Sequence, residues 1–240
     1  MSGICQILGM GPGDPELLTL KAVRLLAGAD CVAWFAACGR PGHARVIAGA
    51  HVPDHAEELR FDYPFTTGVS VEDPRYLIEM AAFYDDCAAR LARELERGRR
   101  IALLCEGDPF LYGSAMYLFD RLSPHFRCEI VPGITGMSGC WSAAALPMVH
   151  GDDVLSVLPA TMDEESLVTW LCKGDAHVIM KIGRNLDKVR AALARSGRES
   201  KAIYVERGTQ SGQLCLPLER APEKAPYFSM VLVPGRARAR

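Results

Sequence analysis

Three short segments that contain glycine and proline, two of them with acidic residues as well, each follow an apolar run of strand type. They are Gly9–Pro15 after Ile4–Leu8, Glu106–Pro109 after Arg100–Cys105, and Pro132–Thr135 after Phe126–Val131. Glycine has no Cβ, so its backbone can approach a ligand closely. The carboxylates of Glu106 and Asp108 can accept hydrogen bonds or pair with a cation. One such segment is explained by a turn, but three together predict a ligand site.

The pattern around these segments alternates between strand and helix. Ile4–Leu8 predicts a buried strand, Glu16–Ala27 a helix with apolar residues at helical spacing, and Ala29–Ala36 a second strand. This unit indicates a parallel sheet. Ligands of open parallel sheets bind beyond the carboxyl ends of the strands, where all three segments lie. We therefore expect the segments to form one site.

The rest of the chain predicts an α/β protein of two domains. Further strands are expected at 100–105, 126–131, 154–159, 177–182, 201–206 and 227–233, with helices at 41–51, 73–97, 114–122, 132–145, 163–171 and 185–196. The segment 61–67, FDYPFTT, mixes polar and aromatic residues and is expected to be irregular. The pattern resets near residue 150, which predicts domains at 1–148 and 149–240.

Composition excludes several classes of protein. The 240 residues are 49% hydrophobic and 23% charged, which is typical of a globular protein. The net charge of −2 provides no overall excess of positive charge that would attract nucleic acid. The basic end, residues 235–240, is interpreted as a solvated tail rather than a binding patch. There is no signal-peptide pattern and no apolar run near the ~20 residues of a membrane span, so we expect a cytoplasmic location without membrane contact.

Neither cysteines nor histidines predict a metal site. The nine cysteines include no Cys-x-x-Cys pair, and Cys31, Cys105 and Cys172 lie in apolar runs, where a thiol acts as a small hydrophobe. The odd number also fits a reducing compartment. Pro53 separates His51 from His55, the one histidine pair at helical spacing, and this weakens a helical metal site.

A nicotinamide dinucleotide site is disfavoured. Gly9–Asp14 begins like the Gly-x-Gly-x-x-Gly fingerprint, but Asp14 stands where the third glycine belongs. Pro12 and Pro15 also remove amide donors that would cradle a pyrophosphate. Asp30 precedes the second strand rather than following it.

The string GMGPGDPELLTLKAVRLL at 9–26 resembles the tetrapyrrole (corrin/porphyrin) methylases, which use S-adenosylmethionine to methylate uroporphyrinogen III and precorrins. The resemblance continues through CEGDPFLYGS at 105–114, VPGITG at 131–136 and RGT at 207–209. DDVLSVLPAT at 152–161, VIMKIGRNLDKV at 178–189, YVERGT at 204–209 and PYFSMVLVP at 226–234 resemble the subgroup that acts on C20 of precorrin-2.

This resemblance implies two αβα domains with the cofactor and substrate cleft between them, and commonly a homodimer. The cofactor contacts that it implies are Pro12, Glu106, Gly107, Asp108, Leu111, Thr135, Gly136, Lys181, Ile182, Gly208 and Thr209. The substrate contacts that we expect are Pro12, Asp14, Tyr112, Arg184 and Arg207. The two arginines suit a substrate with eight carboxylates, because the guanidinium fork matches a carboxylate.

Several roles stay open. Asp14 either contacts pyrrole N–H groups or caps the following helix, and Asp108 either binds the cofactor or starts a helix. Relatives commonly have glycine in place of Glu106 and often a small polar residue in place of Gly136. They often have Tyr-Pro where this chain has Trp34-Phe35, a change at the expected pocket wall.

The implied reaction is a direct displacement at the sulfonium methyl group. Holding the two reactants in line can lower the barrier by ~7–11 kcal/mol. The substrate's own enamine-like electrons activate the carbon, so attack needs no strong base. The C20 proton can then pass to water or to a weak base, and Asp14 is the only catalytic candidate that we name.

The expected function is methylation of C20 of precorrin-2 to give precorrin-3A in cobalamin biosynthesis, with S-adenosylhomocysteine as the second product. The alternatives are the same reaction on cobalt-factor II, methylation at another ring position, and a non-catalytic tetrapyrrole-binding module.

Overall fold

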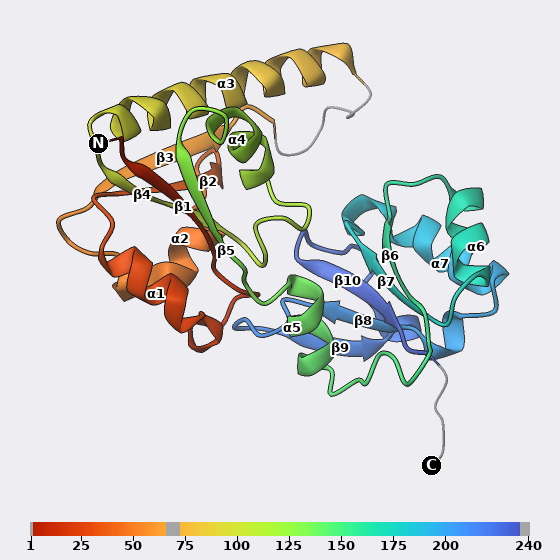
Figure 1. The fold of residues 1–240 in the computed structure, drawn as a ribbon. Helices are drawn as coiled ribbons and strands as arrows, with labels where there is room; N and C mark the ends of the chain where they lie inside the picture. The colour runs from red at the N-terminus through yellow and green to blue at the C-terminus, as the bar shows by residue number, and fades with distance from the viewer. Residues whose placement is uncertain (1, 66–72, 236–240) are drawn as a thin grey trace. The chain divides into compact units, whose positions relative to one another are not determined.

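The computed structural model describes residues 2–65 and 73–235 (Figure 1). The chain divides into two compact units, Met1–Gly136 and Met137–Arg240, each with one five-stranded sheet. The division lies before the expected boundary at 148/149. The reason is that helix α5 (Gly136–Ala143) contributes Cys140 and Trp141 to the core of the second unit.

The sheet of the first unit is entirely parallel. Its strands are β1 (Ile4–Gly9), β2 (Cys31–Ala37), β3 (Glu57–Tyr63), β4 (Arg100–Cys105) and β5 (Arg127–Val131), in the order β3-β2-β4-β1-β5. Parallel strands end at one edge of their sheet. Because β4, β1 and β5 are neighbours, the three segments singled out in the sequence follow adjacent strands at that edge.

Helices cover both faces of this sheet (Figure 1). They are α1 (Leu20–Ala27) and α2 (His43–Ala48) on one face, and α3 (Pro74–Glu96) and α4 (Ala115–Leu122) on the other. Along β4, Leu103 packs toward α3 and α4 while Leu104 packs toward α1 and α2. A parallel sheet buried on both sides needs such continuously apolar strands.

Two local expectations for the first unit were wrong. The helix expected from residue 16 begins as a 3-10 turn, Pro15–Leu17, and α1 starts only at Leu20, with Thr19 as its cap. Residues 61–63, expected to be irregular, complete β3, because Tyr63 stacks on Phe35 of β2 with ring centroids 5.2 Å apart. Residues 66 and 67 of that segment, and 236–240 of the basic end, lie outside the described residues.

The second sheet mixes strand directions. Its strands are β6 (Leu155–Pro159), β7 (Ala176–Met180), β8 (Ile203–Glu206), β9 (Leu214–Pro217) and β10 (Ser229–Val233), in the order β6-β7-β10-β8-β9. β6 and β7 are parallel, and β10 is antiparallel to both β7 and β8. β7 and β8 therefore run the same way and end at one edge. The edge strand β9, antiparallel to β8, was not predicted.

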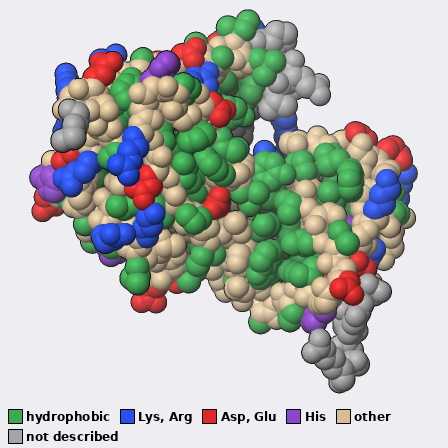
Figure 2. Space-filling view, viewed as in Figure 1, with side chains coloured by type: hydrophobic (Ala, Val, Ile, Leu, Met, Phe, Trp, Pro, Cys, Tyr) green, Lys and Arg blue, Asp and Glu red, His purple; other side chains and the backbone are tan. Residues whose placement is uncertain are grey.

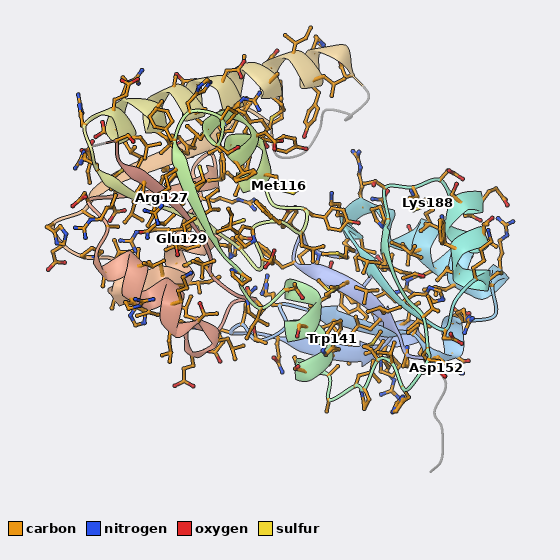
Figure 3. The ribbon with its side chains drawn as sticks, viewed as in Figure 1. Met116, Arg127, Glu129, Trp141, Asp152 and Lys188 are labelled. Carbon is orange, nitrogen blue, oxygen red and sulfur yellow. The ribbon has the colours of Figure 1, made fainter. Side chains whose placement is uncertain are left out.

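Helices α6 (Glu164–Cys172) and α7 (Leu186–Arg195) cover one face of this sheet, and α5 lies on the other. Lys188 of α7, labelled in Figure 3, donates a hydrogen bond from Nζ to the carbonyl of Met162 at 2.6 Å. Four further 3-10 turns complete the secondary structure: Gly49–His51, Gly183–Asn185, Glu199–Lys201 and Leu218–Arg220.

All nine cysteines are free thiols. Cys31 and Cys105 are buried as expected, whereas Cys172 is exposed because it ends α6 at the surface. Among residues 2–65 and 73–235, no helix is long and apolar enough to cross a bilayer.

Candidate functional site

Backbone hydrogen bonds join the first two predicted loops. The Gly107 N–H donates to the Gly11 carbonyl at 2.8 Å, and the Gly11 N–H donates to the Gly107 carbonyl at 3.3 Å. The Met10 N–H also donates to the Cys105 carbonyl at 2.8 Å. The loops that follow β1 and β4 therefore form one continuous ladder beyond the sheet.

The third loop packs against this ladder through glycines. A Cβ on Gly133 would collide with the carbonyl oxygen of Gly107 and would lie 2.9 Å from the Cα of Gly9. Gly11 and Gly107 have φ of 73° and 61°, in the left-handed region that favours glycine. The three loops meet as the sequence predicts, and they do so at a distance that only glycine permits.

Both oxygens of Asp108 hold this cluster together. Oδ1 accepts the Phe110 N–H at 2.9 Å, and Oδ2 accepts the Gly133 N–H at 3.2 Å. Asp14 likewise accepts the Glu16 N–H at 2.9 Å and caps the 3-10 turn. Of the roles left open above, the capping role is therefore observed for Asp14, whereas Asp108 starts no helix, because α4 begins only at Ala115 with Ser114 as its cap. Their contacts with cofactor and substrate stay predictions.

Strand β5, which carries the third loop, is fixed to its neighbours by Glu129 (labelled in Figure 3). Its carboxylate accepts a hydrogen bond from Gln6 Nε2 of β1 at 3.1 Å and pairs with Lys21 Nζ of α1 at 2.7 Å. The Lys21 ammonium, followed by the Gln6 amide, lowers the pKa of Glu129. These contacts stabilise the sheet edge beneath the loops.

Glu106 differs from the other acids of the cluster. Its side chain is partly buried, and burial raises its pKa to about 7. No hydrogen bond or ion pair engages its carboxyl within the described residues. The neighbouring Cys105 thiol is also buried, and its pKa rises to about 12, with the Glu106 carboxylate adding to the effect of burial.

In the second unit, the predicted residues lie on the loops after β7 and β8. Lys181, Arg207 and Thr209 have φ of 57°, 50° and 68°, and Tyr112 in the first unit has φ of 56°. Within the described residues, Ala145 is the only other non-glycine residue with positive φ. This conformation is unfavourable for ordinary side chains and tends to occur at functional sites. The strained positions thus coincide almost entirely with the predicted contacts.

The RGT loop packs tightly on α5. A Cβ on Gly208 would lie 2.8 Å from both Cα and Sγ of Cys140. The Thr209 N–H donates to Gln213 Oε1 at 3.0 Å, but the buried Thr209 Oγ1 has no hydrogen-bond partner among residues 2–65 and 73–235. Buried polar atoms are rarely left unpaired. This unpaired hydroxyl is a feature that the sequence did not reveal.

The arginines expected to bind carboxylates are in different surroundings. Arg184 is exposed and lines a cavity of about 600 Å³ in the second unit, together with Asp187, Arg190, Glu223 and Lys224. Arg207 is exposed, with its Nε 3.8 Å from the Glu206 carboxylate. Acidic side chains lie near both arginines. The contact of Arg184 and Arg207 with the substrate therefore stays a prediction.

The Trp34-Phe35 pair lies within the core of the first unit rather than on an open wall. The Trp34 side chain is buried on the α1 and α2 face, and Phe35 packs among aromatic rings on the α3 and α4 face. Among the remaining predicted contacts, Pro12 and Ile182 are buried, and Leu111, Thr135 and Gly136 are partly buried. The predicted residues thus form one group at the edge of each sheet.

Comparison with known proteins decides the family. The sequence model of the tetrapyrrole (corrin/porphyrin) methylases matches residues 5–221. The chain belongs to this family. It is 52% identical over 229 residues to a precorrin-2 C(20)-methyltransferase from Sinorhizobium sp., covering 95% of this chain and 94% of that protein.

Two further relatives bear on the family's range. A cobalt-precorrin-2 C(20)-methyltransferase from Salmonella typhimurium strain LT2 is 28% identical over 97% of both chains. The crystal structure of uroporphyrin-III C-methyltransferase from Thermus thermophilus, complexed with S-adenosylhomocysteine, covers 96% of this chain and 97% of its own. It matches with a TM-score of 0.67 at 24% identity, which supports the predicted fold class.

Replacing Gly133 with alanine tests the close packing of the three loops. Because the added Cβ meets the Gly107 backbone, which cannot move aside, we expect Gly133→Ala to lower the free energy of unfolding by about 1–3 kcal/mol or more. Urea denaturation measures the change. Gly28→Ala is the control, since the nearest atom there is the flexible end of Arg100 at 3.4 Å. Equal stability of the two variants would contradict the packing argument.

Proposed function

We propose that this protein transfers a methyl group from S-adenosylmethionine to C20 of precorrin-2, giving precorrin-3A in cobalamin biosynthesis. The observation that carries the proposal is the 52% identity with the Sinorhizobium enzyme over 95% of this chain. The segments that resemble the precorrin-2 subgroup, at 152–161, 178–189, 204–209 and 226–234, all lie in the second unit, whereas those that resemble the family as a whole lie in both. Among the strained and closely packed residues, Gly107, Lys181, Gly208 and Thr209 are positions for which the family resemblance implies cofactor contacts, and this supports the proposal.

The residues of these loops fit the cofactor. When bound, S-adenosylmethionine supplies an electrophilic methyl group on its sulfonium. The backbone of residues 106–108, with Leu111, Thr135, Gly136 and Pro12, would hold it from the first unit, without a contact from the Glu106 carboxyl. Lys181, Ile182, Gly208 and Thr209 would hold it from the second. The Thr209 hydroxyl, unpaired within the described residues, offers a hydrogen bond to a ligand that has ammonium, carboxylate, hydroxyl and adenine groups.

In this mechanism the protein mainly positions the reactants. The loop ladder and the Asp108 hydrogen bonds hold the backbone rigid before the ligand arrives. Preorganised loops bind without a further ordering cost. Orientation of this kind can contribute ~7–11 kcal/mol in favourable cases. Asp14, Tyr112, Arg184 and Arg207 are the proposed substrate contacts.

The metal-free substrate is preferred over the cobalt-containing one. Identity is 52% to the relative named for precorrin-2 and 28% to the relative named for cobalt-precorrin-2.

We also propose a cytoplasmic homodimer. Figure 2 shows hydrophobic side chains gathered on one face of the second unit, over its strands, and Leu155, Met180 and Ile203 on the α5 side of that sheet are only partly buried. Such a face is consistent with self-association.

An anaerobic turnover assay with S-adenosylmethionine tests the function. We expect the mass of precorrin-2 to rise by one methyl group, with slower or no methylation of cobalt-factor II. A gain of one methyl group on the cobalt substrate alone would assign the protein to the oxygen-independent route. No gain on either substrate, with the cofactor bound, would contradict methylation at C20.

Thr209→Val tests the cofactor site. The hydroxyl makes no hydrogen bond in the protein, so stability should stay within about 0.5 kcal/mol. Affinity for S-adenosylhomocysteine, measured by calorimetry, should fall about 3–10-fold through loss of one hydrogen bond.

Thr19→Val is the matched control for this variant. Its Oγ1 caps α1 by accepting the Ala22 N–H at 3.1 Å, so this variant should lose about 1 kcal/mol of stability with unchanged affinity. Unchanged affinity in Thr209→Val would remove the Thr209 side chain from the proposed site.

A further inference from the structure

Glu106 begins the second loop, at a point where hydrogen bonds tie the backbone to the first loop. The residue before it accepts a hydrogen bond from the Met10 N–H, and the residue after it exchanges two hydrogen bonds with Gly11. The backbone on both sides of Glu106 is thus tied to the first loop, beside Pro12. A side chain attached to a backbone fixed in this way has a restricted set of positions.

Of the acids in the three loops, Glu106 is the one whose carboxyl the fold does not use. Asp14 caps a 3-10 turn, and Asp108 gives both oxygens to backbone N–H groups. The Glu106 carboxyl is partly buried and has no partner within the described residues. Removing a carboxyl from water without a partner is costly, and such groups are often kept for function.

The state of Glu106 suits proton transfer near neutral pH. Burial raises its pKa to about 7, and no neighbouring charge contributes to that shift. Two titratable residues lie near it in the chain: Cys105, which burial keeps as a thiol, and Asp108. The first loop contributes one further acid, Asp14. A general base is most effective when its pKa lies near the working pH.

We propose that the Glu106 carboxylate is a catalytic residue that accepts the proton leaving C20 of the tetrapyrrole. This inference rests on the proposed function. In the first step, the C20–CH₃ bond forms as the S–CH₃ bond breaks, and C20 becomes tetrahedral. In the second, the carboxylate takes the C20 proton, and the C–H bonding electrons return to the macrocycle. Glu106 leaves the step as a neutral carboxylic acid and is regenerated by loss of the proton to solvent.

The test compares Glu106→Gln with the wild-type protein on precorrin-2 deuterated at its bridge carbons. We expect Glu106→Gln to lower turnover about 10²–10⁴-fold. Affinity for S-adenosylhomocysteine should stay within about twofold, because a positioned base contributes to rate rather than to binding. A primary isotope effect should appear in the variant, because loss of the base makes C–H cleavage slow. Glu16→Gln, on an exposed residue next to the first loop, is the matched control and should behave as wild type.

The pH dependence has a defined sign. A base must be deprotonated, so kcat/KM of the wild type should rise as pH increases through about 7, and Glu106→Gln should lack this rise. Carbon-13 NMR of the ligand-free protein with labelled glutamate gives a readout independent of activity. One carboxyl should titrate near pH 7 and be absent from the variant.

Three results would overturn the proposal. Turnover of Glu106→Gln above half that of wild type would show that another group takes the proton. A tenfold weaker affinity for S-adenosylhomocysteine with an unchanged saturated rate would make Glu106 a cofactor contact instead. If no glutamate carboxyl titrates above pH 6, Glu106 is not a base matched to neutral pH, and the proposal fails. If wild type itself transfers no methyl group to precorrin-2, the proposed function fails, and this inference fails with it.

Discussion

The contact among Gly9, Gly107 and Gly133 is the constraint on which the loops of the first unit depend. Three adjacent parallel strands end at one edge, and their loops can interlock only where no Cβ intervenes. The paired hydrogen bonds between Gly11 and Gly107 then extend the sheet into the loops. Rigid backbone is therefore presented at the place where a parallel sheet ordinarily binds its ligand.

The second unit reaches a similar result by a different route. Its loops are not glycine clusters but contain ordinary residues held at positive φ, with Thr209 left holding an unpaired hydroxyl. Strain and an unsatisfied polar atom both cost stability. A bound cofactor would offset part of that cost by supplying the missing hydrogen bond. Among the acids of the first unit's loops, Glu106 is the one whose carboxyl has no partner within the described residues.

Much of this arrangement could be predicted from the sequence, because glycine and proline after an apolar run identify strand ends. The edge strands were less predictable. Residues 61–63 of β3 depend on aromatic packing against β2, and β9 is a short strand with no distinctive pattern. The antiparallel placement of β10 is set by packing of the whole unit, which local periodicity does not report.

The finer properties of the site also lay beyond the sequence. The positive φ of Lys181, Arg207 and Thr209 could not be predicted, because these residues are not glycine and their types do not indicate a left-handed backbone. The desolvation of Glu106 depends on what surrounds it in three dimensions. The capping hydrogen bond of Asp14, by contrast, was one of the alternatives that the sequence offered, whereas the bond from Asp108 to the third loop was not predicted.

Hydrogen–deuterium exchange with and without S-adenosylhomocysteine tests most directly the central claim that loops of both units hold the cofactor. The account predicts slower amide exchange in peptides covering 106–111, 133–136, 181–183 and 207–209, with α2 at 43–48 unchanged. Protection confined to one unit would contradict the account, even if the ligand bound tightly.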